Sequence, residues 1–324
     1  MSASTKSLDE LLDPSVLHLK PLTAKDLPAH PSLQPQQAAS ATSLPDLVQF
    51  ILSILSSAEL LGRSINDTFV PLGVPWASPP ATSPVEIWVR DIYPHELAPR
   101  VPRKVETWFA RRSVHVPREE RGTATWEEFE QGWWQSHSEQ EKEYISDVID
   151  VVKVADWSDQ IPALASWGGS RNPEIRWGEV GLCVYESAYK LPFPLKYRYF
   201  SELVVTARMK NNSSPGTSSL LLVQVPVDLT GGPPIATSMY SSSRHRTDAP
   251  IPELRKPIVR GEYVSVERVF WNKRGDIGWD MATASDAKGH VPRVLQNALI
   301  PRTIAMDVGR FMDWQDNQRA SSAA

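Results

Sequence analysis

Two short segments carry charged side chains whose types and spacing suit the anchoring of a ligand. Arg111, Arg112 and His115 lie in the first segment, and Glu267 and Arg268 lie in the second. An arginine offers a planar fork of donors that suits a carboxylate, a phosphate or a hydroxyl group. Adjacent residues on a strand point to opposite faces, so each neighbouring pair directs only one charge inward. Ion pairing on an outer face is the simpler interpretation of the same residues.

The apolar neighbours of each arginine indicate which one faces inward. Arg112 shares its strand face with Trp108 and Val114, and Arg268 shares its face with Phe270. An isolated buried charge is costly, so an arginine within such a stripe must meet a partner, water or a ligand. We therefore predict that Arg112 and Arg268, together with Trp108 and Phe270, line a ligand cavity.

No catalytic or metal-ligating pattern accompanies these charges. The seven histidines show no His-x-x-x-His spacing, and the single cysteine, Cys183, cannot supply a cysteine-based metal site. Gly-x-Gly-x-x-Gly and P-loop motifs are absent from the sequence, which disfavours nucleotide-dependent enzymes. A net charge of −4 gives no general attraction to nucleic acid. We expect no metal, no cofactor and no nucleic-acid partner.

Composition places the chain among soluble globular proteins. The 324 residues are 41% hydrophobic and 22% charged, which is ordinary for a folded domain. The first residues lack the apolar core of a secretory signal, and no run reaches the roughly 18 to 20 apolar residues of a membrane span. A single cysteine fits a reducing compartment. The sequence thus predicts a cytoplasmic protein.

The elements that must position these residues begin with a helix. Residues 1–42 are rich in Pro, Ser, Ala and Gln, a composition that predicts a flexible arm. Residues 43–66 repeat apolar side chains at helical spacing, with Ser43 as the expected N-cap. A proline-rich connector is expected over residues 71–102, within one domain spanning 43–318, and a disordered tail over 319–324.

Strands dominate the rest of the domain. Runs of β-branched and aromatic residues bounded by turn residues predict an antiparallel sheet with helices segregated from it. Two segments, 125–134 and 139–149, have helical spacing instead. The expected strands are residues 107–116, 151–157, 177–188, 198–209, 219–229, 262–271 and 278–284.

A long helix closes the chain, from about Pro292 to Trp314. Val308, Phe311 and Met312 belong to its apolar stripe, which is usually core but can also cover a ligand. Pro301 is expected to kink or break this helix because proline cannot donate to the preceding turn.

The segment before this helix resembles the end of START lipid-transfer domains, in which Asp-x-x-Gly-x-(Ile/Val)-Pro-x-x-Leu-x-Asn leads into the last helix. The matching residues are Asp286, Gly289, Val291, Pro292, Leu295 and Asn297. Four separated segments also occur in the order seen in a fungal family, DUF3074, which is placed in the START-like superfamily. They are residues 108–115, 221–228, 263–269 and 279–286, and the resemblance covers roughly residues 43–316.

The resemblance implies an α+β, START-like helix-grip fold, in which a curved antiparallel sheet wraps the C-terminal helix and an extra N-terminal helix packs outside. It also implies binding, with transfer as an extension, of a lipid or other hydrophobic molecule. The alternatives are a cofactor-independent cyclase or isomerase of fungal secondary metabolism and, more weakly, an interaction scaffold. Transient membrane contact through the basic segment 241–261 is a further expectation. The expected ligand-binding residues are Trp108, Arg112, Arg268, Phe270, Val308, Phe311 and Met312.

Overall fold

A single curved sheet organises the protein. The computed structural model describes residues 17–33, 44–93, 105–161, 175–191, 197–211, 218–231, 235, 237–240, 252–255, 258–289 and 291–322. The sheet runs in the order β2-β3-β4-β11-β10-β8-β7-β6-β5, and every pairing along it is antiparallel. Two short strands attach in parallel, β1 to β8 and β9 to β7. The strands are β1 (Leu22–Thr23), β2 (Val70–Pro71), β3 (Glu86–Ile92), β4 (Glu106–His115), β5 (Val148–Asp156), β6 (Ile175–Tyr189), β7 (Arg198–Asn211), β8 (Ser218–Asp228), β9 (Val259–Arg260), β10 (Glu262–Trp271) and β11 (Ile277–Asp286).

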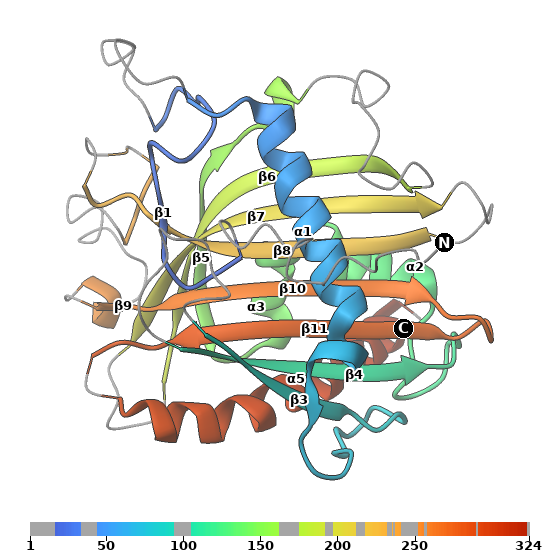
Figure 1. Ribbon diagram of the computed structural model, residues 1–324. Helices are drawn as coiled ribbons and strands as arrows, with labels where there is room; N and C mark the ends of the chain where they lie inside the picture. Colours follow the sequence, from blue (N-terminus) through green and yellow to red (C-terminus); the bar gives the residue numbers. More distant parts are fainter. Residues whose placement is uncertain are drawn as a thin grey trace, which may run out of the picture.

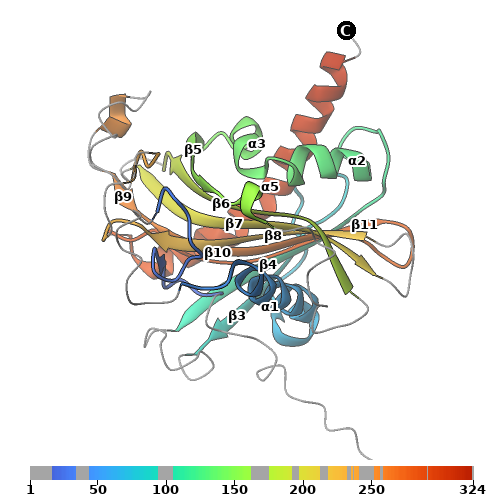
Figure 2. The same ribbon diagram turned by 90° about the horizontal axis from the view of Figure 1, so that it is seen from above.

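Helices cover both faces of this sheet. One helix crosses one face, which we call the α1 face, and the others lie on the opposite face, the α5 face (Figures 1 and 2). Apolar side chains fill both interfaces, so the sheet separates two hydrophobic cores. This arrangement confirms the predicted α+β class, with a large antiparallel sheet, a long C-terminal helix and an extra N-terminal helix. The α-helices are α1 (Leu47–Thr68), α2 (Trp126–Phe129), α3 (His137–Tyr144) and α5 (Arg293–Ser322), with a π-helical turn at Glu130–Trp134 and 3-10 turns at Ser158–Gln160 and Pro252–Arg255.

Helix α1 is a core helix. Its length and composition alone would allow it to cross a membrane, but most of its apolar stretch is buried in the fold. It packs on β7, β8, β10 and β11. Asp46 is its N-cap and accepts a hydrogen bond from the backbone N of Gln49, a common way to satisfy a free first-turn N–H. The predicted cap, Ser43, lies outside the described residues.

Part of the predicted flexible arm belongs to the core. Leu27 and Leu33 are fully buried, and β1 pairs with the end of β8. The prediction of a flexible arm is therefore wrong for residues 17–33, because leucines spaced among the prolines find apolar surface on the α1 face.

Two predicted boundaries also change. The connector over residues 71–102 contains β3, which pairs with β4 along its length. The predicted helix over residues 139–149 ends at Tyr144, and β5 begins at Val148, where β-branched residues favour a strand.

Helix α5 is longer than predicted. It continues through Pro301 without interruption and ends at Ser322. Arg319, in the predicted disordered tail, forms an ion pair with Glu128, with Nε 2.6 Å from Oε1. The tail prediction is therefore wrong up to Ser322.

Candidate functional site

The predicted ligand-binding residues lie on opposite faces of the sheet. Trp108 belongs to the α1-face core, and Arg112, Arg268 and Phe270 line a cavity beneath α1. The predicted ligand-binding residues of α5, which are Val308, Phe311 and Met312, belong to the core on the α5 face. One sheet separates the two groups, so the seven residues cannot surround one ligand. The expectation that Arg112 and Arg268 share one ligand cavity with Val308, Phe311 and Met312 is therefore wrong.

Arg111 and Glu267 occupy the α5 face in their place. Arg111 Nη2 lies 2.9 Å from Glu267 Oε2, and both residues are almost fully buried. The Trp279 indole N–H donates to the same carboxylate at 3.1 Å, and the guanidinium stacks 4.0 Å from the Trp279 ring centroid. Arg111 Nε and Nη1 make no hydrogen bond with any described residue. The pair places a compensated charge within the aromatic core.

Close-packed side chains fill the space around this pair. The ring centroid of Phe311 lies 5.1 Å from that of Phe129 and 5.4 Å from that of Trp279. Val308, Phe311 and Met312 are fully buried in the same cluster. Nearby, burial and then the Arg111 charge lower the pKa of His115 to about 3, so its ring is neutral. We therefore assign these residues a packing role.

A different part of the α5 face holds an unpartnered acid. Glu202 of β7 is 3% exposed, and its carboxyl forms no hydrogen bond or ion pair within the described chain. Burial raises its pKa to about 8. Phe200 precedes it on the same strand face, with its ring 5.3 Å from Tyr189 and 6.3 Å from Tyr263. At neutral pH the acid is mostly protonated and can donate a hydrogen bond.

Two further carboxyls face the same region. Burial, and then the charges of Glu202, Asp307 and Glu267, raise the pKa of Glu141 well above its usual value. Burial likewise raises the pKa of Asp307 to about 6, while Arg111 opposes that rise. The side chains of Glu141 and Asp307 nevertheless keep 22% and 25% of their surface accessible, so water-sized molecules reach them.

We call Glu141, Tyr189, Glu202, Tyr263 and Asp307 the Glu202 cluster. The cluster combines α3, three strands of the sheet and α5. Sequence reasoning predicted the strand but missed Glu202. The available signal was the alternation of an acid with Phe200 and Val204 on one strand face, the pattern that drew attention to Arg268.

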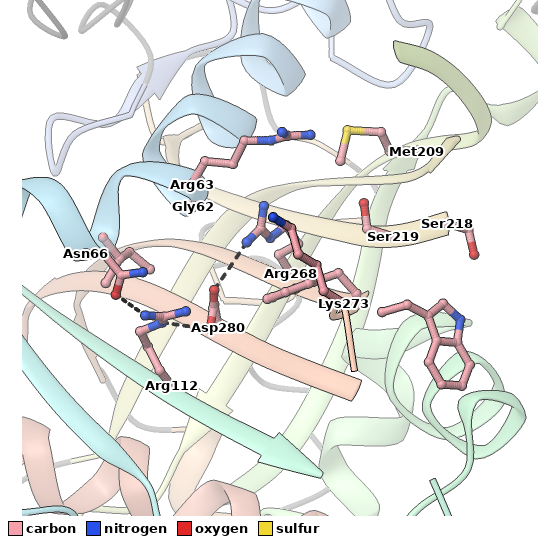
Figure 3. Close-up of a pocket in the computed structure, with 13 residues that line it drawn as sticks. Gly62, Arg63, Asn66, Arg112, Met209, Ser218, Ser219, Arg268, Lys273 and Asp280 are labelled. Carbon is pink, nitrogen blue, oxygen red and sulfur yellow. Dashed lines mark hydrogen bonds and ion pairs between the residues drawn. The ribbon is translucent and has the colours of Figure 1, made fainter. Parts of the chain in front are cut away.

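The predicted arginines instead meet on the α1 face. Arg112 Nε and Arg268 Nη2 approach the two oxygens of Asp280 at 3.1 Å and 3.3 Å (Figure 3). They border a cavity of about 530 Å³ beneath the C-terminal half of α1. Of the basic segment 241–261, most lies outside the described residues, and Arg260 pairs with Asp228 at 2.7 Å.

Comparison with known proteins gives one family and several solved structures with a similar chain course. The family described as "Protein of unknown function (DUF3074)" matches residues 108–315. No curated protein matches the chain in sequence.

Three solved structures follow a similar chain course. Human StAR-related lipid transfer protein 5 has a TM-score of 0.48 and 14% identity, over 86% of this chain and 98% of that chain. Human STARD10 has a TM-score of 0.46 and 15% identity, over 87% and 86%. A STAR-related lipid transfer protein from Xanthomonas axonopodis has a TM-score of 0.40 and 10% identity, over 78% and 99%. At these values the similarity extends to the general course of the chain and no further.

Proposed function

The chain belongs to the DUF3074 family, and we propose that it binds an apolar small molecule, such as a lipid, through one polar group of that molecule. The ligand lies between the α5 face of the sheet and α5, with its polar group at Glu202. The observation that carries the proposal is the buried and unpartnered Glu202 carboxyl. A buried polar group without a partner costs about 1–3 kcal/mol, and apolar sites use a few such groups to orient a ligand.

The surroundings of Glu202 restrict the ligand. A protonated carboxyl donates to a hydroxyl, carbonyl or ester oxygen, and the rings of Phe200, Tyr189 and Tyr263 offer apolar contact. Asp307 lies near the same space and, with a pKa of about 6, is largely ionised at neutral pH, so an anionic head group would meet a like charge. The ligand class is therefore a neutral or cationic amphiphile.

Identification of bound material tests the proposal directly. The purified full-length protein is extracted with organic solvent and examined by native mass spectrometry, and it is titrated with fluorescent sterol, phosphatidylcholine and fatty-acid probes. We expect a neutral or cationic amphiphile to be recovered or bound. Absence of any bound molecule, together with no uptake of any probe, would contradict the proposal.

Variants locate the site. Glu202→Leu removes the hydrogen bond and should weaken probe binding about tenfold, whereas Glu202→Gln keeps a donor and should retain most of the affinity. Glu143→Leu changes an exposed acid of α3 and serves as the control. Equal affinities for Glu202→Leu and Glu143→Leu would place the ligand elsewhere. A vesicle-to-vesicle transfer assay with the best probe then separates binding from transfer.

A second candidate function is a cofactor-independent cyclase or isomerase in the same space. Glu202 favours it, because a carboxyl with a pKa of about 8 is suited to give and take protons near neutral pH. Incubation with the recovered molecule, followed by chromatography, distinguishes the two functions. A new product that Glu202→Gln abolishes without loss of binding indicates catalysis, and unchanged material indicates binding alone.

A further inference from the structure

The cavity beneath α1 lies on the opposite face of the sheet from the Glu202 cluster. Its volume is about 530 Å³, and α1, β4, β7, β8, β10 and β11 contribute to its wall. Figure 3 shows basic side chains from the helix and from the strands gathered around one space. We call this cavity the α1 pocket.

The charges around the α1 pocket are unbalanced. Arg63, Arg112, Arg268 and Lys273 line it, whereas Asp280 is its one acidic lining residue among the described part of the chain. Arg63 also pairs with a neighbouring carboxylate of α1, at 2.8 Å. Four cations thus face two carboxylates, which leaves an excess of positive charge that favours an anionic ligand.

Both carboxylate oxygens of the acid in the α1 pocket, Asp280, already have arginine partners. Asp280 is 3% exposed, and each of its oxygens contacts one arginine, Arg112 or Arg268. Arg112 Nη1 also donates to the Asn66 side-chain oxygen. These contacts hold both guanidinium groups in place without help from a ligand, so the pocket is preorganised.

Donors remain unused in this arrangement. The Arg268 side chain is 11% exposed, and its Nε is buried without a hydrogen-bond partner in the described chain. Lys273 is exposed and forms no ion pair with a residue that the structure places. A buried N–H without a partner is unfavourable, and the exposed Lys273 ammonium at the wall of the pocket can reach an incoming anion.

The remaining wall combines polar and apolar side chains. Asn66, Ser218 and Ser219 line it together with Ile65, Met209 and Phe270, and the Arg268 guanidinium stacks 4.1 Å from the Phe270 ring centroid. Small-molecule sites typically occupy about 300–1,000 Å³. The α1 pocket therefore has room for an organic group beside the anion.

We propose that the α1 pocket binds the phosphate group of a small organic molecule, with Arg268, Lys273 and Arg63 as the recognising cations. A phosphate presents several oxygens to donors converging from different directions, and arginine pairs with it through two parallel hydrogen bonds. Phe270 and Met209 contact the organic part. A soluble phosphate ester and a phospholipid head group share this chemistry. The site is independent of the ligand proposed at Glu202.

Calorimetric titration of the full-length protein tests the α1 pocket. The probes are inorganic phosphate, glycerol 3-phosphate and dihexanoyl phosphatidic acid as a monomer. We expect the ester or the lipid to bind about tenfold more tightly than inorganic phosphate, because the apolar side chains of the wall add contact. Binding of glycerol 3-phosphate identifies a soluble ester as the source of the phosphate, and tight binding of the lipid alone identifies a head group.

Lys273 lines the pocket and its neighbour Arg274 does not, so variants of these two residues form a matched pair. Lys273→Gln and Arg63→Gln should each weaken binding about tenfold, whereas Arg274→Gln should leave it unchanged because this exposed neighbour does not line the pocket. Circular dichroism checks that the variants remain folded. The proposal is overturned if none of the three probes binds, or if Arg274→Gln weakens binding as much as Lys273→Gln.

Discussion

Glu202 makes the stability of this protein depend on pH in a way that one substitution isolates. Its pKa is about 8 in the fold, against an ordinary value of 4.5. Because the folded protein holds the proton more tightly than the unfolded chain, the stability that the neutral acid contributes is fully present below pH 4.5. That stability is lost as the pH rises from 4.5 through 8. Glu202→Gln replaces the acid with a neutral side chain of similar shape and removes this titration.

The size of the effect follows from the two pKa values. At about 1.4 kcal/mol for each tenfold difference in proton affinity, the wild type should lose about 3–4 kcal/mol between pH 5 and pH 8 through this group. That loss is a large fraction of the roughly 5–15 kcal/mol by which a domain is stable. The Glu202 charge also raises the pKa of Glu141, so the difference between the two proteins includes this coupling as well as the titration of Glu202 itself.

Urea denaturation at pH 5, 6, 7 and 8 provides the measurement. The free energy of unfolding of Glu202→Gln, minus that of the wild type, should rise by about 3–4 kcal/mol across this range. Glu143→Gln, at an exposed site on α3, should differ from the wild type by no more than about 0.5 kcal/mol throughout. A difference for Glu202→Gln that stays constant with pH would refute the burial of an unpartnered acid at this position.

Three other perturbations test the packing. Arg111→Met leaves the Glu267 carboxylate buried without its cation and should lower the free energy of unfolding by about 3–5 kcal/mol in urea denaturation. The double variant Arg111→Met/Glu267→Leu should recover most of that stability. A double variant no more stable than the single one would contradict this. Leu27→Ala, at a fully buried site, should cost about 2–5 kcal/mol by the same method, and a neutral result would restore the flexible-arm prediction. Gly309→Ala places a methyl group 2.5 Å from the Ser78 carbonyl oxygen and should lower stability by about 1–3 kcal/mol, read as a lower Tm; an unchanged Tm would argue against this close contact.

The sequence predicted the strands better than it predicted their faces. Alternation divides β4 into two sets, Arg112 with Trp108 and Arg111 with Phe109, but it does not say which set faces α5. A polar face would have marked the solvent side, yet both faces of β8 are buried. Because α1 and α5 each cover one face, the apolar neighbours of Arg112 and Arg268 indicated that these residues are buried. They did not indicate which of the two helices covers them.

Other differences arise from composition. Prolines on both sides of β3 concealed a short alternating strand, whose pairing with β4 is a long-range contact that local patterns do not contain. The Glu202 cluster was missed for a related reason. Its members come from α3, β6, β7, β10 and α5, so only the tertiary fold brings them together.

The strand order has a consequence for the synthesis of the chain. The middle of the sheet consists of β8, β10 and β11, and all three are made late, whereas β3, β4 and α1 are made early. At about 5–20 residues per second, the ribosome needs roughly 10–40 s to proceed from the end of α1 to the end of β11. During that interval α1, apolar enough to resemble a membrane span, lacks the complete set of strands that buries it. The nascent chain should therefore depend on chaperones until β11 has emerged.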